Sequence, residues 1–371
     1  MAYKILFITG QLNAGGAERV LIDILRHFDY TKYQVDLCQI IKGGALIDEV
    51  PTNVNIYHVW DNYTLHYKLS YRASNQLGID YFIHKKLKQK ITEKYDVVIS
   101  FLEGMPLKMH AILNPNAINI SWVHCDLFND PYEARQFRKN EEFAAYNKMD
   151  KVICVSKSAK ESFLKRFPLV KTVVDVVYNP IDARKIVSLS NEYFVNRSDL
   201  FTISVLGRLC SQKCIDRVIR LASNLKQNGY KFLINIIGDG ELRNELEQLS
   251  RELSVSDVVT FHGYKKNPYP LIKSSDLLLS CSGFEGFSLS ICEAMCLGVP
   301  VISTKTAGPT EIIGNNEYGI LCGHSEYDIF NAVKYAIENR YALAMYSKKG
   351  HERVKKFSPG NCIEMIENIC Y

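Results

Sequence analysis

The sequence predicts an α/β fold made of two doubly wound, Rossmann-like domains, and three observations lead to this prediction. Short runs rich in β-branched residues alternate with helical segments, as in parallel strands joined by crossover helices. A polar interval over residues 181–199 interrupts this alternation, which then starts again. The length of 371 residues allows two cores of ordinary domain size. We therefore expect an N-terminal domain at 1–180, a linker at 181–199 and a C-terminal domain at 200–354.

In chain order, the first half contains a strand, a helix and five further strands: KILFIT, AERVLIDILRHF, QVDLCQII, DVVISFL, INISWV, KVICVS and TVVDVVY. After the interval, strands and helices alternate as FTISVLG, DRVIRLASNLKQNG, KFLINIIGDG, ELRNELEQLSREL and VVTFHG, followed by the strands DLLLSCS and VPVIST. A helix at about 355–371 is expected to pack back on the N-terminal domain. Because ligands of such sheets bind beyond the carboxyl ends of the strands, we expect the site in the loops after strands, at a cleft between the domains.

Composition excludes several classes of protein. The chain is 47% hydrophobic and 23% charged, with a net charge of +5 and no block of like charge long enough for a nucleic-acid-binding arm. Acidic small molecules or a membrane surface suit this charge better. The start MAYKILFITG lacks the pattern of a secretory signal, and no run reaches the roughly 18 apolar residues of a membrane span, so we expect a cytoplasmic protein. The eleven cysteines include no C-x-x-C pair, which favours reduced thiols.

The first loop of interest follows the opening strand at residues 9–19. Gly15 and Gly16 leave backbone N–H groups and a helix N-terminus accessible to an anion or a hydroxyl group. A P-loop is excluded because Gly16 and Ala17 stand where that motif needs Lys and Ser or Thr. The alternative is a glycine turn that serves only tight packing.

A second loop, GRLCSQK, follows the strand FTISVL and places Arg208 and Lys213 five residues apart. The guanidinium of an arginine and the ammonium of a lysine can bind one anion from two sides, and a diphosphate is the expected ligand. The alternative is a pair of solvated surface cations.

The third loop is the stretch SCSGFEGFSLSICEAMCLGVP, which sets two carboxylates among apolar and small residues. Glu285 lies in the loop after a buried strand, and Glu293 stands alone on an apolar helix that starts at about Ser288. A buried carboxylate without partners costs several kcal/mol, so Glu293 is expected to receive hydrogen bonds from protein groups or from ligand hydroxyls.

These motifs together resemble the retaining glycosyltransferases of family GT4, which have the GT-B fold. FEGFSLSICEAMCLGVPVIST is similar to the family's E-x7-E signature, and NAGGAER, GRLCSQK, GDGELRNELE and FHGY stand in the family's order. The resemblance covers nearly the whole chain. It implies two Rossmann-like domains facing a central cleft, and transfer of a hexose or N-acetylhexosamine from a nucleoside diphosphate sugar, with UDP the expected carrier. The acceptor would be a saccharide, lipid-linked, in bacterial cell-surface polysaccharide or glycan biosynthesis.

The resemblance also implies roles for individual residues. Arg208 and Lys213 would hold the diphosphate, Glu293 the ribose hydroxyls, and Glu285 the donor sugar. His124, in SWVHCD, would face the transferred sugar, although a lone histidine is also typical of a packed structural residue. The expected catalytic set is His124, Glu285, Arg208 and Lys213. The expected donor-binding set is Gly15, Gly16, Arg208, Lys213, Gly286, Phe287, Ser288, Leu289 and Glu293.

One departure from the family pattern is Cys214, which replaces the glycine that usually follows the lysine and could shift the loop of Lys213. No D-x-D motif stands near a cleft loop, so we expect no metal and no cofactor, with the two cations stabilising the leaving phosphate. The likeness favours a same-face route in which the departing phosphate takes the acceptor's proton.

Residues 81–95 contain five lysines and one glutamate, with Ile83, Leu87 and Ile91 on one stripe. This segment could lie on an anionic membrane surface, or it could be a surface helix packed on its own sheet with solvated lysines.

Three other functions are weighed. A nucleotide-sugar epimerase shares the two-domain architecture but needs no acceptor. A non-catalytic nucleotide-sugar-binding protein has no need for both glutamates. A dehydrogenase is disfavoured because the G-x-G-x-x-G fingerprint is missing.

Overall fold

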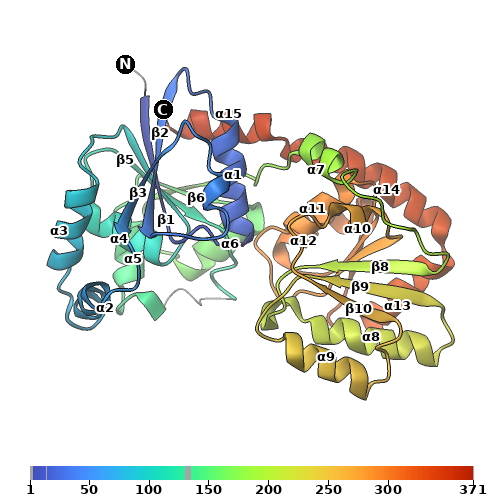
Figure 1. The fold of residues 1–371 in the computed structure, drawn as a ribbon. Coiled ribbons are helices and arrows are strands. Elements are labelled where there is room, and N and C mark those ends of the chain that lie inside the picture. Colours follow the sequence, from blue (N-terminus) through green and yellow to red (C-terminus); the bar gives the residue numbers. More distant parts are fainter. Residues whose placement is uncertain (1–2, 14, 130–134, 371) are drawn as a thin grey trace. The chain divides into compact units, whose positions relative to one another are not determined.

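The computed structural model describes residues 3–13, 15–129 and 135–370. The chain folds into two compact units, residues 1–180 with 359–371 and residues 181–358 (Figure 1). Each unit contains one parallel sheet with helices packed against it, of seven strands in the first unit and six in the second. The predicted α/β class with two doubly wound domains is therefore confirmed. The interval at 181–199 belongs to the second unit and carries a helix, α7 (Ala183–Leu189).

The first sheet has the strand order β3-β2-β1-β4-β5-β6-β7, and its neighbouring strands pair in parallel. Its strands are β1 (Tyr3–Thr9), β2 (Tyr33–Ile41), β3 (Asn55–Trp60), β4 (Val97–Phe101), β5 (Ile118–Val123), β6 (Lys151–Cys154) and β7 (Val173–Val176). The helices of this unit include α1 (Gly16–His27), η1 (Ile47–Glu49), α2 (Leu65–Arg72), the π-helix η2 (Ala73–Leu77), α3 (Tyr81–Lys90), α4 (Met105–Leu113), α5 (Glu141–Tyr146), α6 (Lys157–Arg166) and α15 (Pro359–Cys370).

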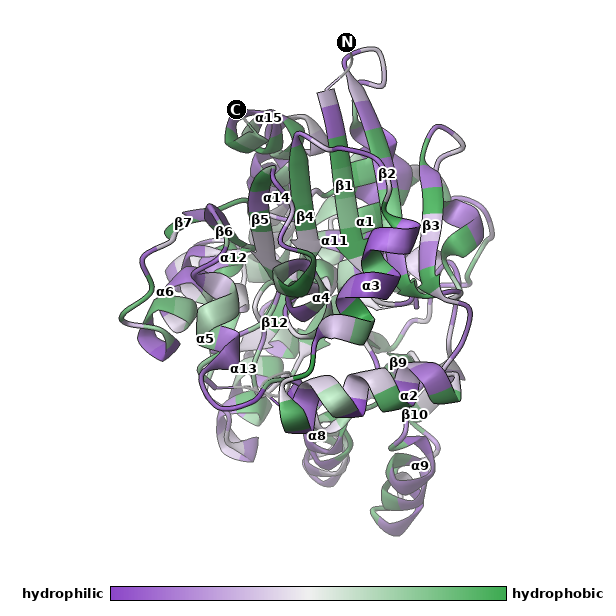
Figure 2. Cartoon of the chain, turned by 90° about the vertical axis from the view of Figure 1, so that its left-hand side faces the viewer, coloured by the Kyte–Doolittle hydropathy of each residue, from purple (hydrophilic) through white to green (hydrophobic). Residues whose placement is uncertain are grey.

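The central strands form because their residues are apolar on both faces, and parallel strands covered on both sides need this composition. All five residues of β4 are buried, and Ile5 to Ile8 of β1 are fully inaccessible to solvent. In Figure 2 these strands are mainly green, the colour of hydrophobic residues. β3 lies at the edge of the sheet, and four of its six residues are at least partly accessible.

The second sheet has the strand order β10-β9-β8-β11-β12-β13. Its strands are β8 (Phe201–Leu206), β9 (Phe232–Ile237), β10 (Val259–Gly263), β11 (Leu277–Ser280), β12 (Val301–Thr304) and β13 (Ile320–Cys322). With α7, the helices of this unit include η4 (Ser211–Lys213), α8 (Ile215–Gln227), α9 (Arg243–Glu252), α10 (Tyr269–Lys273), α11 (Leu289–Cys296), α12 (Ala307–Glu317), α13 (Glu326–Glu338), α14 (Arg340–Val354) and η5 (Lys355–Phe357).

Helix α15 returns the chain to the first unit, where it packs against α1. Two long-range hydrogen bonds hold it there. The Tyr3 hydroxyl donates to the carbonyl of Cys370 at 2.7 Å, and Lys151 Nζ donates to the carbonyl of Ile369 at 2.6 Å. The first unit is thus built from two stretches of chain that are separated by the whole of the second unit.

Parallel strands end at the same edge of their sheet, so topology decides which loops meet. In the first unit, β1, β4 and β5 are neighbours, which sets the loop before α1 beside the residues after Phe101 and Val123. In the second unit, β8, β11 and β12 are neighbours, which gathers residues 207–213, 281–288 and 305–308. These two edges carry the sequence-predicted site residues.

Candidate active site

Lys213 and Glu285 form an ion pair at the carboxyl edge of the second sheet. Lys213 ends the short helix η4, and its Nζ donates to Glu285 Oε1. Ser282 Oγ donates to the same oxygen at 2.8 Å. Because Glu285 is only 6% exposed, these contacts compensate for the loss of hydration of its carboxylate. The structure therefore joins two residues that the sequence assigned to different parts of the donor.

Arg208 lies nearby in sequence but has a different partner. Its Nε and Nη2 lie 3.2 and 3.1 Å from Glu241 Oε2, and 73% of its side chain is exposed. An ion pair this exposed contributes little to stability. The guanidinium can therefore exchange this carboxylate for a more highly charged anion at low cost.

Glu293 occupies the middle of α11, where it is half-buried rather than buried as expected. The Tyr269 hydroxyl donates to Glu293 Oε1 at 3.0 Å. This contact supplies a hydrogen bond from the protein, which a carboxylate on an apolar helix requires. The partial exposure leaves room for a ligand hydroxyl as well.

The loop between β11 and α11 is shaped by a close approach of α12. Gly308 donates its backbone N–H to the carbonyl of Glu285 at 2.9 Å. A Cβ at Gly308 would lie 2.7 Å from the Gly286 carbonyl oxygen and 2.8 Å from Phe287 Cα, so a larger residue would push the loop away. Gly286, Phe287 and Ser288 are buried, and Leu289 opens α11 half-buried. The sequence reasoning did not single out Gly308, although a glycine four residues after a buried strand, at the start of a helix, was the available signal.

Cys214 has a left-handed backbone conformation, with φ 47° and ψ 48°. Glycine adopts this region without steric cost, which gives a physical reason for the glycine that Cys214 replaces. The Cys214 Sγ donates to the Ser211 carbonyl at 3.3 Å. The cysteine therefore occupies the glycine conformation, and Lys213 still reaches Glu285.

The loop that contains Gly15 and Gly16 leads into the N-terminus of α1. Gly15 is the N-cap residue and Gly16 is the first helical residue. A Cβ at Gly15 would collide with the carboxylate of Glu18, which folds back over the start of the helix. Burial, with a smaller contribution from Glu103, raises the pKa of the Glu18 carboxyl.

His124 follows β5, and its ring packs against aromatic neighbours. The ring centroids of His124 and Phe101 are 4.6 Å apart, and the Trp122 ring stacks at 6.3 Å. Burial lowers the pKa of His124 to about 3, so the imidazole is neutral at pH 7. Its Nε2 is buried and finds no hydrogen-bond partner among the described residues. A buried, unpaired polar atom in a folded protein calls for an explanation, and ligand binding is one.

Glu103 positions the backbone of His124, and the sequence reasoning missed it. Its Oε2 accepts the His124 backbone N–H at 2.9 Å, and the residue is 7% exposed. Burial raises the pKa of this carboxyl, and the His124 N–H partly offsets the rise. The signal available in the sequence was a glutamate at the carboxyl end of the strand DVVISFL.

The lysine-rich segment forms α3, which ends at Lys90. Its apolar stripe faces the interior: Ile83 and Leu87 are fully inaccessible and Ile91 is 8% exposed. These side chains belong to the core of the first unit, which agrees with the alternative of a surface helix packed on its own sheet. A role of the exposed lysines at a membrane surface stays a prediction. The lysines at 85, 88, 90 and 94 are exposed.

Within the part of the chain that the structure describes, no group of three or more His, Cys, Asp or Glu side chains is arranged to hold a metal ion. Over the same residues, no helix has the length and apolar character needed to cross a membrane.

Comparison with known proteins identifies the family. The profile described as "Glycosyltransferase Family 4" matches residues 14–185, and the profile described as "Glycosyl transferases group 1" matches residues 192–353. Together the two matches span most of the chain. The chain belongs to the GT4-type glycosyltransferases of the GT-B fold, as its motifs implied.

Among curated relatives, an N-acetylgalactosamine-N,N'-diacetylbacillosaminyl-diphospho-undecaprenol 4-alpha-N-acetylgalactosaminyltransferase of Campylobacter jejuni is 29% identical over 214 residues, which is 57% of each chain. An uncharacterized glycosyltransferase of Haemophilus influenzae is 26% identical and aligns over 85% of this chain and 84% of its own length. Among solved structures, Alr3699/HepE of Anabaena in complex with UDP and glucose has a TM-score of 0.77 at 20% identity, covering 99% of this chain and 98% of that one. This last likeness shows the fold alone.

Proposed function

We propose that this protein is a retaining, metal-independent glycosyltransferase. It moves a hexose or an N-acetylhexosamine from a UDP-sugar to a saccharide acceptor, in the synthesis of a bacterial cell-surface polysaccharide or glycan. The observation that carries the proposal is the gathering of Arg208, Lys213 and Glu285 in loops at one edge of the second sheet. Two cations and a carboxylate at this edge suit a diphosphate attached to a sugar.

The donor would bind by exchanging ion-pair partners. Arg208 and Lys213 each contact a carboxylate in the structure, and a diphosphate offers each of them a denser negative charge. The second unit is also the part of the chain that the group 1 profile matches. The solved structure of Alr3699/HepE, which has the same fold, contains UDP and glucose, and this supports UDP as the carrier.

The reaction would proceed on one face of the sugar. The bond between the anomeric carbon and the phosphate oxygen breaks, the acceptor oxygen bonds to that carbon, and the departing phosphate takes the acceptor's proton. Negative charge grows on the phosphate as the bond breaks, so cations fixed beside it stabilise the transition state. Arg208 and Lys213 supply this charge in place of a divalent ion.

The first unit would contribute contacts to uncharged groups. The neutral imidazole of His124, with its unpaired Nε2, suits a sugar hydroxyl better than a phosphate. The name of the Campylobacter jejuni relative specifies an acceptor attached to diphospho-undecaprenol, which supports a lipid-linked saccharide as the acceptor class. Such an acceptor places the protein at the inner face of the cell membrane as a peripheral protein.

The proposal is tested by incubating the protein with individual UDP-sugars, with and without saccharide acceptors, in the presence of EDTA. We expect UDP release that increases with a suitable acceptor and a product that keeps the anomeric configuration of the donor. The variant Arg208→Ala serves as the inactive control. Conversion of the donor to an epimer without an acceptor would replace the proposal with the epimerase alternative. Activity that EDTA abolishes and manganese restores would remove the metal-independent mechanism.

A further inference from the structure

One surface of the first unit combines exposed apolar side chains with basic ones. The exposed large hydrophobic residues between positions 63 and 82 are Tyr63, Leu65, Leu69, Leu77, Ile79, Tyr81 and Phe82. Leu65 and Leu77 are 72% and 71% exposed, and exposed apolar side chains that gather in one segment are typical of an interaction site. We call the exposed side chains of residues 63–90 the α2–α3 face. Figure 2 shows hydrophobic and hydrophilic residues mixed along α2.

The α2–α3 face carries the excess charge of the protein. Residues 63–90 contain six lysine or arginine residues and one aspartate, so their net charge of +5 equals that of the whole chain. The remainder of the chain is therefore electrically balanced. Lys68, Arg72, Lys85, Lys88 and Lys90 are all exposed. None of these five has a carboxylate partner within the described residues, so their charge is available to an external anion.

Packing and hydrogen bonds hold the segment of the α2–α3 face to the rest of the first unit, so its leucines are not exposed because the segment is frayed. Tyr67 packs edge-on against Trp60, with ring centroids 5.1 Å apart. Ser74 Oγ donates to Asp80 Oδ1 at 2.6 Å. Lys108, which is 1% exposed, donates to Asn75 within the π-helix η2. Each element of the face thus has an inward side fixed to the unit and an outward side left free.

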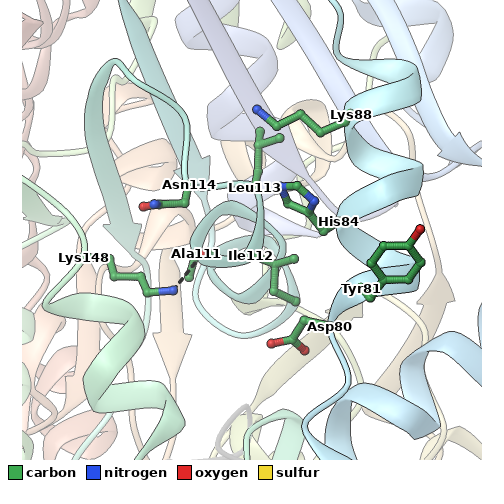
Figure 3. A pocket seen from close by; sticks show the side chains of 9 residues that line it. All are labelled: Asp80, Tyr81, His84, Lys88, Ala111, Ile112, Leu113, Asn114 and Lys148. Atoms are coloured by element: carbon green, nitrogen blue, oxygen red, sulfur yellow. Dashed lines mark hydrogen bonds between the residues drawn. The ribbon is translucent and has the colours of Figure 1, made fainter.

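A pocket of about 490 Å³ opens beside α3 (Figure 3). Its lining includes Asp80, Tyr81, His84 and Lys88 on the side of α3, and Asn114 and Lys148 on the opposite side. Lys148 Nζ donates to the carbonyl of Ala111 at 3.0 Å, as the dashed line in Figure 3 marks. The lining is mainly polar and holds two lysines against one carboxylate. It can therefore accommodate a polar, anionic group next to the face.

We propose that the α2–α3 face binds an anionic lipid bilayer. The exposed leucine, isoleucine and aromatic side chains enter the interface between headgroups and acyl chains, and the basic side chains contact lipid phosphates. This inference deepens the proposed function by naming the surface that would bring the enzyme to a lipid-linked acceptor. A second copy of the chain is a poor occupant, because two faces with a charge of +5 each would repel one another.

The experiment uses the full-length protein and vesicles of phosphatidylcholine, with and without phosphatidylglycerol, in a co-sedimentation assay at low and high salt. The charge variant is Lys85→Gln/Lys88→Gln/Lys90→Gln, and its control is Lys348→Gln/Lys349→Gln/Lys356→Gln, at lysines that are exposed in the second unit. The apolar variant is Leu65→Ser/Leu69→Ser/Phe82→Ser. Its control is Leu169→Ser/Phe194→Ser/Tyr341→Ser, at residues that are 77% to 88% exposed.

We expect the parent protein to sediment with anionic vesicles, to bind neutral vesicles weakly, and to be released in part by high salt. Each lysine near an anionic surface strengthens binding about fivefold, so the charge variant should bind roughly a hundredfold more weakly. The apolar variant should bind more weakly and be released completely by salt. Both controls should behave like the parent.

Three results would overturn the inference: a parent that does not bind anionic vesicles at low salt, controls that lose binding as the variants do, or an apolar variant that binds like the parent. Hydrolysis of a UDP-sugar is measured on the same samples without vesicles, and the variants should keep it. A parent protein that hydrolyses the UDP-sugar but does not bind anionic vesicles contradicts only the membrane surface, whereas a parent protein that binds vesicles but shows no hydrolysis contradicts only the proposed function. A dimer in solution that the apolar variant dissociates would assign the face to a second copy instead.

Discussion

The polar site residues of the two units have opposite environments. In the second unit, Lys213 and Arg208 are each paired with a carboxylate, and Arg208 is largely exposed. In the first unit, the titratable groups at the sheet edge, Glu103 and His124, are withdrawn from water, and burial shifts both pKa values toward the neutral forms. The cations of the second unit can therefore exchange their carboxylate partners for an ionic ligand. The neutral groups of the first unit are suited to contact uncharged hydroxyl groups. Each prediction below tests one side of this contrast.

The largest effect is expected from breaking the buried ion pair. Among the described residues, Lys213→Met leaves the carboxylate of Glu285 with Ser282 as its remaining side-chain partner, which should lower the free energy of unfolding by about 3 kcal/mol. Lys213→Met/Glu285→Gln also removes the unpaired carboxylate and should recover most of the lost free energy of unfolding. UDP release should stay absent in this double variant. Urea unfolding and UDP release are measured on both variants. If Lys213→Met unfolds like the parent, the pairing is not what keeps Glu285 buried.

Removing the exposed cation should separate activity from stability. Arg208→Ala should lower kcat/KM about a hundredfold, because a contact that strengthens as the phosphate departs is worth about 3 kcal/mol in the transition state. Its melting temperature should not change, since the pair with Glu241 is at the surface. The matched control, Glu241→Ala, frees Arg208 and should keep or raise kcat/KM. A loss of activity in both variants would show that the ion pair itself is needed.

The first unit should respond to pH through its buried histidines. Burial lowers the pKa of His110 to about 4 and of His124 to about 3, while both stay near 6.5 in the unfolded chain. The unfolded state then binds more protons below pH 6.5, so each histidine should reduce stability by roughly 2 kcal/mol at pH 5.

Glu18 and Glu103 act with opposite sign, because burial raises their pKa values and acid then favours the folded form. The measurement is therefore the difference in unfolding free energy between pH 7 and pH 5 for the parent and for His110→Gln. The variant should lose less stability than the parent over this range. Equal losses would mean that His110 is protonated in the folded protein as easily as in the unfolded chain.

The two glutamates of the donor loop and helix should differ in kinetics. Glu293→Gln should raise the KM for the donor about tenfold with little change in kcat, because ribose hydroxyls do not change during the reaction. Glu285→Gln should mainly lower kcat, because it lies where charge develops. Tyr269→Phe, which removes the hydrogen bond from the Tyr269 hydroxyl to Glu293, is the control for misplacement of that carboxylate. The same kinetic defect in both glutamine variants would refute this division of roles.

The smallest effect concerns the backbone at Cys214. Cys214→Gly relieves a left-handed conformation and should raise the free energy of unfolding by up to about 1 kcal/mol. Cys210→Gly is the matched control, because Cys210 has an extended backbone with φ −133° and gains no such relief. Thermal melting compares the two. A destabilised Cys214→Gly would indicate that the Sγ contact with Ser211 outweighs the strain.

Sequence patterns predicted the fold because its strands are short, continuous and apolar. DVVISFL and DLLLSCS have no polar face, so their burial in parallel sheets followed directly. The sequence analysis did not predict β3, because this edge strand has four accessible or partly accessible residues followed by only two buried ones and so lacks a continuous apolar run. The stripe on α3 was ambiguous because an apolar stripe looks the same whether it faces a core or a bilayer.

The charged residues of the candidate site could be predicted from the sequence, because Arg208, Lys213 and Glu285 stand in loops directly after apolar strands. Glu103 and Gly308 could not be found this way. Glu103 acts on a residue 21 positions along the chain, across two neighbouring strands. Gly308 matters only because folding brings α12 against the loop of Glu285. Their roles arise from tertiary proximity, which a local pattern does not encode.

The return of α15 to the first unit has a consequence for how the protein is made. A hydrogen bond joins Tyr3 to a residue 367 positions later, so the first unit cannot complete its packing while the ribosome is still adding the second. At roughly 5–20 residues per second, synthesis of residues 181–358 leaves the surface of α1 that α15 will cover exposed for roughly 10 to 40 s. During that interval the nascent chain presents an apolar surface to cellular chaperones, and the second unit, which is continuous in sequence, can finish folding before the first.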